Sequence, residues 1–389
     1  MINLDILILH NTFLPDYTGS SIRLYNLVSR IPYNISVVTP EKMVNGEYFR
    51  LKSEKINNIQ IKRVKSLSPP SIWKMPVFRY FYHEKKIFNH CKNEKFDIIQ
   101  ARSLPPYIVT AYKLHKKFKT PLLLELHPNE KDVNQFYMFY VMNILKIAKK
   151  ASHTITLTNS LKNWVQKEYS LDSEKITVIP NGVDCEKFKP GNKSNTGESL
   201  RNKIGNPEKI VLYAGYLDQV NGMDMLIKII PTIVRENPEI SFVFMGNGPY
   251  YNTINELSKK IPQVNLLKTV NHELMPDYYL DSDIFIIPRP STISSELVTP
   301  LKLLEAMSME SIVLGSNVGG ISEVITNEKN GYLYEKDDPK SFIDLLVTSL
   351  EHDNSRIARN ARKTIINEYS WEKSAAKLKN IYDFLNPIN

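Results

Sequence analysis

The chain has 389 residues, of which 42% are hydrophobic and 23% charged, and a formal net charge of +9 at pH 7. This length exceeds one ordinary hydrophobic core and indicates two domains of roughly 180 residues each. The composition is typical of a globular protein, and no uninterrupted apolar run approaches the roughly 20 residues of a membrane-spanning helix. The two cysteines, Cys91 and Cys185, exclude a disulfide framework and a cysteine-rich metal site.

The positive charge lies in the first half of the chain. Residues 1–190 contain 29 Lys and Arg against 16 Asp and Glu, whereas the remaining residues contain 21 against 25. Basic residues interleave with aromatic and apolar residues at 72–92, 112–119 and 145–150. Such stretches suit peripheral contact with a membrane surface or an anionic acceptor, but a helix with a solvated basic face has the same pattern. No nucleic-acid-binding motif accompanies the charge, so nucleic acid is not expected as a partner.

Apolar runs of strand length alternate with helical patterns along the chain. The first ten residues, MINLDILILH, lack a basic segment and contain Asp5, which indicates a first strand and a cytoplasmic protein without a signal peptide. Strands are predicted at 5–10, 35–40, 97–102, 121–127, 154–160, 176–181, 210–217, 240–248, 264–270, 283–290 and 311–317. Helices are predicted between them, as at 20–31, 107–118 and 160–169. The alternation predicts the α/β class, with two doubly wound parallel sheets.

A polar segment at 191–209 separates the two series and is the natural linker. We therefore expect a first domain at 1–190 and a second at 191–368, followed by a closing helical segment at 369–389. In doubly wound sheets, ligands bind beyond the carboxyl ends of the strands. The segments that follow the predicted strands are therefore the candidate ligand-binding loops.

One of these loops leads into the stretch SSELVTPLKLLEAMSM at 294–309. Thr299 and Pro300 are typical of a helix start, because Thr299 can cap the first free amides and Pro300 suits the first turn. The free amides at 300–303 would form an anion site. Glu305 lies one turn into this helix, among apolar residues. It is either a solvated surface Glu or a carboxylate that leans toward the ligand edge and accepts hydrogen bonds from a ribose diol.

The stretch TPLKLLEAMSMESIVLGSNVGGISEVITNEKNGYLYEKDDP resembles the nucleotide-sugar-binding region of the retaining glycosyltransferases of family 4, which have the GT-B fold of two Rossmann-like domains. The likeness continues in VIPNGVDCEKFKP, VLYAGYL, FVFMGNGP, DYYLDSDIFIIP and YSWEKSAAKLKNIYDFL, and upstream in LPDYTGSSIRLYNL and PLLLELH. The helix itself is similar to the TPLKPLEAM pattern of an envelope-polysaccharide subgroup. The resemblance implies an N-terminal acceptor domain, a C-terminal donor domain and a closing helix that crosses back to the first.

The resemblance also implies roles for individual residues. Glu305 matches the second Glu of the family's E-x7-E motif, which holds the ribose, and His127 matches the histidine beside the transferred sugar. Gly19 would let the first loop approach the diphosphate. The remaining donor-binding residues implied are Gly215, Tyr216, Asn221, Gly246, Gly248, Val270, Arg289, Glu296, Leu297, Thr299, Pro300, Leu301 and Lys302.

The sequence departs from the family pattern at the sugar and diphosphate contacts. Leu297 stands where the motif's first Glu is expected, and Glu296 is one residue out of register. Tyr216 and Asn221 stand where the family has Arg and Lys. Since a diphosphate leaving group needs positive charge or oriented amides, either Arg289, Lys302 and the helix end replace them or the donor chemistry is altered.

The function implied is transfer of a sugar, with retention, from a nucleoside diphosphate sugar to an envelope glycan, lipid-linked saccharide or glycolipid. Two alternatives remain at this point: a nucleotide-sugar epimerase of the same fold, and a non-catalytic GT-B subunit. No cofactor or metal is expected, because Asp281 and Asp283 of the DSD sequence precede a strand instead of following one. We expect them to end a helix and begin that strand.

Overall fold

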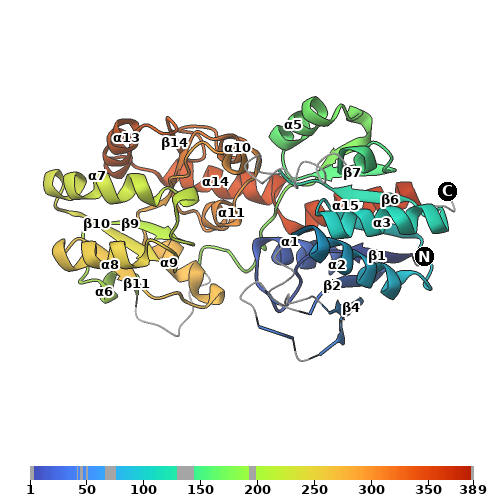
Figure 1. The fold of residues 1–389 in the computed structure, drawn as a ribbon. Helices are drawn as coiled ribbons and strands as arrows, with labels where there is room; N and C mark the ends of the chain where they lie inside the picture. Colours follow the sequence, from blue (N-terminus) through green and yellow to red (C-terminus); the bar gives the residue numbers. More distant parts are fainter. Residues whose placement is uncertain are drawn as a thin grey trace. The chain divides into compact units, whose positions relative to one another are not determined.

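A computed structural model describes residues 4–41, 43, 47–49, 51–65, 76–128, 144–191 and 199–386. The chain forms two compact units, each with its own sheet (Figure 1). Unit 1 comprises Met1–Pro180 and Trp371–Asn389, and unit 2 comprises Asn181–Ser370. In the described part of the chain, no helix has both the length and the apolar character needed to cross a membrane.

The described residues of unit 1 form an eight-stranded sheet in the order β3-β4-β2-β1-β5-β6-β7-β8. Its neighbouring strands pair in parallel except β3 and β4. The strands are β1 (Asp5–Leu9), β2 (Asn34–Pro40), β3 (Ser53–Ile56), β4 (Ile59–Val64), β5 (Ile98–Arg102), β6 (Leu122–Glu125), β7 (His153–Thr156) and β8 (Ile176–Val178). Helices α1 (Gly19–Val28), α2 (Pro76–Cys91), α3 (Pro105–Phe118), α5 (Asn159–Tyr169) and α15 (Trp371–Leu385) belong to the same unit.

Within the described residues, unit 2 contains a six-stranded parallel sheet in the order β11-β10-β9-β12-β13-β14. The strands are β9 (Lys209–Ala214), β10 (Ile240–Met245), β11 (Val264–Leu267), β12 (Ile284–Ile287), β13 (Val313–Ser316) and β14 (Tyr332–Tyr334). The helices are α6 (Leu200–Lys203), α7 (Met223–Glu236), α8 (Tyr251–Lys260), α9 (Met275–Asp281), α10 (Ile293–Leu297), α11 (Leu301–Ser308), α12 (Gly319–Ser322), α13 (Pro339–Glu351) and α14 (Ser355–Glu368). Three-residue 3₁₀ turns are η2 (Ser173–Lys175) in unit 1, and η3 (Gln219–Asn221) and η4 (His272–Leu274) in unit 2.

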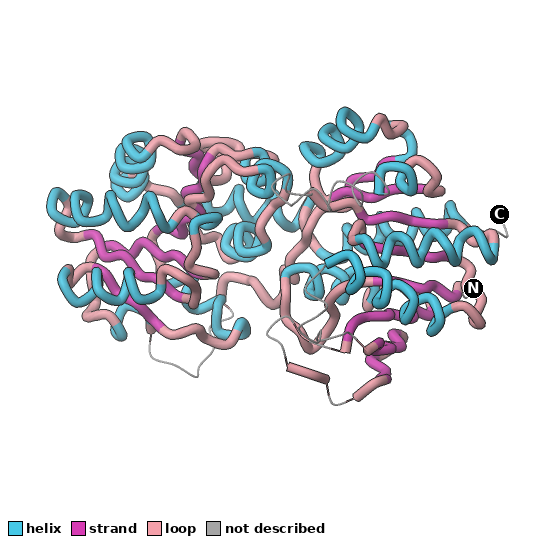
Figure 2. The backbone as a smooth tube through the Cα atoms, in the orientation of Figure 1, coloured by secondary structure: helices cyan, strands magenta, loops and turns pink. Residues whose placement is uncertain are grey.

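Burial on both faces explains why the central strands are continuous apolar runs. In β9, Ile210 and Leu212 join one hydrophobic core cluster, whereas Val211 and Tyr213 join another. Because successive side chains of a strand point to opposite faces, these two clusters lie on the two faces of the sheet. Figure 2 shows the magenta strands of each unit between cyan helices. The predicted α/β fold of two doubly wound, Rossmann-like units is confirmed.

Short strands account for the elements that the sequence did not reveal. Strands β3 and β4 form an antiparallel hairpin whose turn contains Asn57 with a φ of 53°, a left-handed conformation that Asn tolerates. Charged residues interrupt both strands, so no apolar run marks them. Strand β14 has only three residues.

Residues 181–190, which the sequence assigned to the first domain, pack with unit 2. Val183 forms an isolated parallel bridge with Ser370, and its amide donates to the Tyr369 carbonyl. Phe188 is buried with its ring centroid 6.3 Å from that of Tyr279. These contacts precede the polar linker, so the structural division follows Pro180 and not residue 190.

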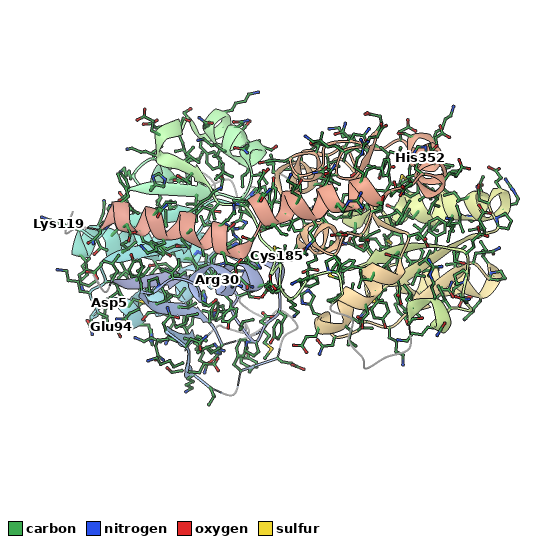
Figure 3. All side chains as sticks on the ribbon, turned by 180° about the vertical axis from the view of Figure 1, so that it is seen from behind. Asp5, Arg30, Glu94, Lys119, Cys185 and His352 are labelled. Atoms are coloured by element: carbon green, nitrogen blue, oxygen red, sulfur yellow. The ribbon has the colours of Figure 1, made fainter. Side chains whose placement is uncertain are left out.

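The closing helix α15 is part of unit 1. Trp371, Leu378 and Tyr382 are buried, and the Tyr382 hydroxyl donates to Gln100 on β5. The Ser374 hydroxyl donates to the Pro180 carbonyl at 3.0 Å. Figure 3 shows the helix, near the red end of the colour scale, lying along the sheet of unit 1. The end of the chain therefore contributes buried side chains to the core of unit 1, in addition to those of the first 180 residues.

Replacing Leu378, which is fully buried in α15, by Ala should lower the free energy of unfolding of unit 1 by about 2–5 kcal/mol, because the change leaves a cavity. Trp164 and Trp371 belong to unit 1, and residues 181–370 of unit 2 contain no tryptophan, so tryptophan fluorescence during urea unfolding reports unit 1. Lys377→Ala, at an exposed position of the same helix, is the control. Equal effects of the two substitutions would contradict the assignment of α15 to the core.

Candidate functional site

The strand order of unit 2 reverses at β9, which lies between β10 and β12. At such a switch point the loops after the two central strands separate and leave a crevice beyond the carboxyl ends. Gly215 follows β9, and Arg289 follows β12 by two residues. Helix α11 reaches the same edge, since Lys302 contacts the last residues of β9.

Glycines hold the loops after β9 and β10 against each other. The φ angles of Gly215, Gly246 and Gly248 are 145°, 156° and 152°, which side chains rarely tolerate. A Cβ on Gly246 would lie 1.8 Å from the Gly215 carbonyl oxygen, and one on Gly248 would lie 2.5 Å from the Leu217 carbonyl oxygen. The Leu217 amide donates to the Asn247 carbonyl at 2.9 Å. The two loops therefore pack backbone to backbone.

Lys302 packs against the end of β9. Its Nζ donates to the Tyr213 hydroxyl and to the Ala214 carbonyl, both at 3.1 Å, and lies 4.3 Å from the centroid of the Tyr213 ring. A Cβ on Gly215 would lie 2.5 Å from this nitrogen. Burial, and then repulsion from Arg289, lower the pKa of Lys302 to about 7. The ammonium is thus held at the switch point at considerable electrostatic cost.

Arg289 provides a second, partly buried cation at this edge. Its Nη1 donates to the Val298 carbonyl at 3.2 Å, and its Nε has no hydrogen-bond partner in the structure as described. Burial lowers the pKa of Arg289. A buried, incompletely paired guanidinium is costly, so this group is ready to bind an anion.

The positions that correspond to the family's cations have other environments. Tyr216 is 58% exposed. Asn221 lies in η3, where its Nδ2 donates to Asp218 Oδ1 at 2.7 Å. The structure thus brings Lys302 and Arg289 to the switch point, while Tyr216 and Asn221 contribute no charge there.

Glu305 is buried, with 9% of its surface exposed, so it is not a solvated surface Glu. Its Oε1 lies 2.8 Å from His272 Nε2, and its Oε2 accepts a hydrogen bond from the Tyr279 hydroxyl at 3.1 Å. Burial, together with the Glu305 charge, raises the pKa of Tyr279 well above its usual value. The tyrosine therefore remains a hydrogen-bond donor to the carboxylate.

Sequence reasoning missed His272 and Tyr279 as partners of Glu305. His272 lies in η4 and Tyr279 in α9, about 30 residues before the carboxylate. The His272 side chain is 47% exposed, while the Tyr279 side chain is buried. A polar His in the loop after β11 was the available signal. Val270, in the same loop, packs against the hydrophobic core of unit 2.

The start of α11 differs from the expectation. Pro300, with φ −73° and ψ 138°, is the N-cap residue, and the helix begins at Leu301 without a side-chain cap. Thr299 is buried, and its carbonyl accepts a hydrogen bond from Asn181 Nδ2 at 2.8 Å. The prediction that Thr299 caps the helix is wrong, because Pro300 stands between Thr299 and the first helical turn.

The Glu296 carboxylate is already hydrogen-bonded within the protein. Its oxygens accept from the Gly319 amide at 2.8 Å, the Ser291 hydroxyl at 2.7 Å and Lys336 Nζ at 2.6 Å. Burial opposes ionisation, but these three donors lower the pKa of Glu296. Leu297 is 7% exposed and apolar. Neither residue therefore offers a free carboxylate in the place of the motif's first Glu.

Gly19 and His127 lie in unit 1. Gly19 is the exposed first residue of α1, after a capping box in which the Thr18 hydroxyl accepts from the Ser21 amide. The His127 amide donates to the Ser103 hydroxyl, and its Nε2 lies 3.4 Å from Glu125 Oε1 without forming a hydrogen bond. Burial, followed by repulsion from Arg102, lowers the pKa of His127 to about 4. The imidazole is therefore neutral at pH 7.

Asp281 and Asp283 have structural partners. Asp281 ends α9 and accepts from the Leu200 amide, and Asp283 pairs with Arg201 at 2.7 Å immediately before β12. This arrangement matches the expectation that they end a helix and begin a strand. Among the described residues, no group of three or more His, Cys, Asp and Glu side chains is placed to hold a metal ion.

Two family models match the two halves of the chain. The model described as Glycosyltransferase Family 4 matches residues 19–187, and the model described as Glycosyl transferases group 1 matches residues 198–368. The chain is a glycosyltransferase of the GT-B fold. The second match contains Lys302, Arg289 and Glu305, and the first contains His127.

Several proteins resemble this glycosyltransferase along much of their length. An uncharacterized glycosyltransferase of Methanocaldococcus jannaschii is 26% identical over 345 residues, which are 85% of each chain. The UDP-Gal:alpha-D-GlcNAc-diphosphoundecaprenol alpha-1,3-galactosyltransferase of Escherichia coli is 30% identical over 242 residues, which are 60% of this chain and 61% of that protein. The structure of Anabaena HepE in complex with UDP-glucose has a TM-score of 0.73 at 16% identity and covers 98% of this chain and 100% of that one.

In the ligand-free glycosyltransferase, Lys302→Met should raise the free energy of unfolding by about 1–3 kcal/mol at pH 7, as apolar replacements of buried charges often do. The unfolded chain binds a proton at Lys302 up to about pH 10.5, whereas the folded chain releases it near pH 7. The gain in the free energy of unfolding of Lys302→Met over the wild type should therefore be constant below pH 7 and fall as the pH rises toward 10.5.

Chemical denaturation followed by circular dichroism at pH 7 and pH 10 measures this difference. Lys228→Met, on the exposed side of α7, is the control and should change stability by less than about 0.5 kcal/mol. A loss of stability in Lys302→Met at pH 7 would show that the ammonium stabilises the ligand-free fold.

Proposed function

We propose that this glycosyltransferase moves a sugar from a nucleoside diphosphate sugar bound by unit 2 to a glycan, lipid-linked saccharide or glycolipid of the cell envelope. Unit 1 binds the acceptor, and the sugar keeps its anomeric configuration. The donor assignment is supported by Lys302 and Arg289, which lie at the ends of β9 and β12, and by Glu305, which lies one turn after Lys302 on α11. Retention and the roles of the two units rest on the family resemblance.

Lys302 and Arg289 would hold the donor diphosphate. A leaving diphosphate is stabilised by fixed positive charge and oriented amides in a water-excluded site. Lys302 packs against the Tyr213 ring, Arg289 has a buried and unpaired Nε, and α11 begins without a side-chain cap. A bound diphosphate would pair these groups and favour the charged form of Lys302. The structural neighbour from Anabaena was solved with UDP-glucose, a donor of this class.

Glu305 would bind the ribose of the donor. Tyr279 fixes one carboxylate oxygen from the buried side, while the half-exposed His272 contacts the other. Ribose hydroxyls would replace His272 at Oε1 and leave the Tyr279 hydrogen bond in place. The carboxylate is thereby oriented before the donor binds. Gly215, Gly246, Gly248 and Val270 would line the same site.

His127 would lie beside the transferred sugar. Its low pKa keeps the ring neutral, so it can donate or accept one hydrogen bond without adding charge to the reacting sugar. We propose that no metal takes part, because Asp281 and Asp283 are committed to the Leu200 amide and Arg201. Glu296 and Leu297 would contribute shape and not an additional carboxylate.

The epimerase and the non-catalytic subunit are not favoured. Both family models and the named relatives are glycosyltransferases. The loss of the family's usual cations, which motivated the non-catalytic alternative, is offset by Lys302 and Arg289 in unit 2. The relative from Escherichia coli is named for a diphosphoundecaprenol-linked acceptor, which supports a lipid-linked saccharide as the acceptor class.

Glu305→Ala should weaken donor binding roughly ten- to a hundredfold, because it removes charge-assisted hydrogen bonds worth about 1.5–3 kcal/mol. Glu305→Gln should be intermediate, and His127→Ala should lower turnover more than donor affinity. Calorimetric titration with the donor and a transfer assay separate the two effects. Glu351→Ala, at an exposed position of α13, is the control. Wild-type affinity and turnover in both site variants would refute the proposed site.

The basic surface of unit 1 would bring the enzyme to an anionic membrane that carries the acceptor. Lys116 and Lys150 both face the Tyr112 ring, at 5.0 and 5.8 Å from its centroid, so α3 and the residues before β7 share one basic patch. Attraction to anionic lipid is worth about 1 kcal/mol for each such residue and is screened by salt.

The enzyme should sediment with vesicles that contain phosphatidylglycerol at low salt and be released as salt rises. The double variant Lys116→Glu and Lys150→Glu should bind less, whereas Lys228→Glu in unit 2 should bind as the wild type does. An absence of binding at low salt would indicate that the acceptor is reached in solution.

A further inference from the structure

Polar side chains converge at the switch point of unit 1, as they do in unit 2. The strand order reverses at β1, which lies between β2 and β5. His10 follows β1, Arg102 is the last residue of β5, and Glu125 is the last residue of β6. His127 follows two residues later. These side chains therefore lie at the edge where doubly wound sheets bind ligands.

Two arginines at this edge have very different environments. Arg23, on α1, donates through Nε to Glu125 Oε1 at 2.7 Å and through its two Nη atoms to the carbonyls of Pro180 and Ile179. Both partners of this ion pair have side chains that are 3% exposed. Arg23 is thus fully satisfied by the protein, and it uses the carboxylate of Glu125.

Arg102 is not satisfied in this way. Its Nη1 donates to Asn11 Oδ1 at 3.1 Å, its buried Nε has no partner, and it forms no ion pair with a described residue. The nearby His127 Nε2 is also buried and without a hydrogen bond. Arg23, Arg102 and Glu125 together leave one uncompensated positive charge.

Burial of an unpaired guanidinium is costly, and a protein that needed only a stable core could replace it with an apolar residue. The neighbouring imidazoles do not supply a negative charge. Burial, followed by the positive charge of Arg102, lowers the pKa of His10 to about 3 and that of His127 to about 4. The His10 ring is held through Nδ1 by the Thr12 carbonyl at 2.7 Å. Both rings are neutral hydrogen-bonding groups at pH 7.

We propose that Arg102 binds an anionic group of the acceptor, either a phosphate or a carboxylate, together with Asn11 and His127. The Nε side of a guanidinium presents N–H groups in the geometry that binds oxyanions, and this side is the unpaired one. The inference deepens the proposed function, because it names the chemistry of the acceptor that unit 1 would take. A lipid-linked saccharide supplies a phosphate, and an acidic glycan supplies a carboxylate.

Nuclear magnetic resonance of the full chain with labelled histidine tests this site without an activity assay. The His127 signal is assigned by its loss in His127→Gln. Inorganic phosphate and glucuronate, added at constant ionic strength and pH, are the two probes. At least one should shift the His127 signal, and Arg102→Met should weaken that binding at least about tenfold. A shift with phosphate identifies a phosphorylated acceptor, and a shift with glucuronate identifies an acidic glycan.

A signal that neither probe moves, or that moves equally in Arg102→Met, would overturn the proposal. The shift of the His127 signal reports binding in unit 1, so phosphate bound at Lys302 in unit 2 does not produce it. Donor binding is measured on the same sample with nucleoside diphosphate sugars. A failure of donor binding would count against the proposed function, and the result with phosphate or glucuronate would be unaffected.

Thermal unfolding separates a ligand-binding arginine from a structural one. Arg102→Met should leave the melting temperature of the ligand-free protein unchanged or raise it, because it removes an unpaired charge. Arg23→Met is the matched control and should lower the melting temperature strongly, because it leaves Glu125 buried without its partner. Equal destabilisation by the two substitutions would show that Arg102 is structural and would overturn the proposal.

Discussion

The contact between the Lys302 ammonium and the end of β9, at the Tyr213 hydroxyl and the Ala214 carbonyl, is the interaction on which the candidate donor site depends. A Cβ at position 215 would lie 2.5 Å from Nζ, and a Cβ at position 246 would lie 1.8 Å from the Gly215 carbonyl oxygen. The glycines therefore allow the two loops and α11 to converge, and the convergence buries a cation where the strands end. Without it, unit 2 would have the fold of a glycosyltransferase but a weaker positive field where we propose that the diphosphate binds.

The two units apply the same principle to different side chains. Parallel strands bring their carboxyl ends to one edge, so residues far apart in sequence meet at the switch point. In unit 2 these are Lys302 and Arg289, and in unit 1 they are Arg102 and His127. Each set contains an arginine whose Nε is buried and has no hydrogen-bond partner among the described residues. At the switch point of each unit there is therefore an incompletely paired positive charge that does not stabilise the ligand-free fold.

Much of the fold followed from the sequence because buried central strands leave long apolar runs. The hairpin β3–β4 and strand β14 did not, since short or charged strands leave no such run. In the site, Glu305 stood out as a carboxylate among apolar residues, and Arg289 and Lys302 as the nearby cations. The pairing of His272 and Tyr279 with Glu305 and the Pro300 cap could not be predicted, because pairing across separate loops and the exact helix start depend on tertiary packing.

The central claim is that unit 2 binds a nucleoside diphosphate sugar through Lys302, Arg289 and Glu305. A thermal-shift panel of nucleoside diphosphate sugars, with the corresponding nucleoside monophosphates for comparison, tests it most directly. At a hundred times its dissociation constant, a true donor stabilises the folded state by about 2.7 kcal/mol. The account predicts a clear shift with at least one diphosphate sugar, a smaller one with its monophosphate, and a loss of the shift in Glu305→Ala. No shift with any diphosphate sugar, or an equal shift in the variant, would contradict it.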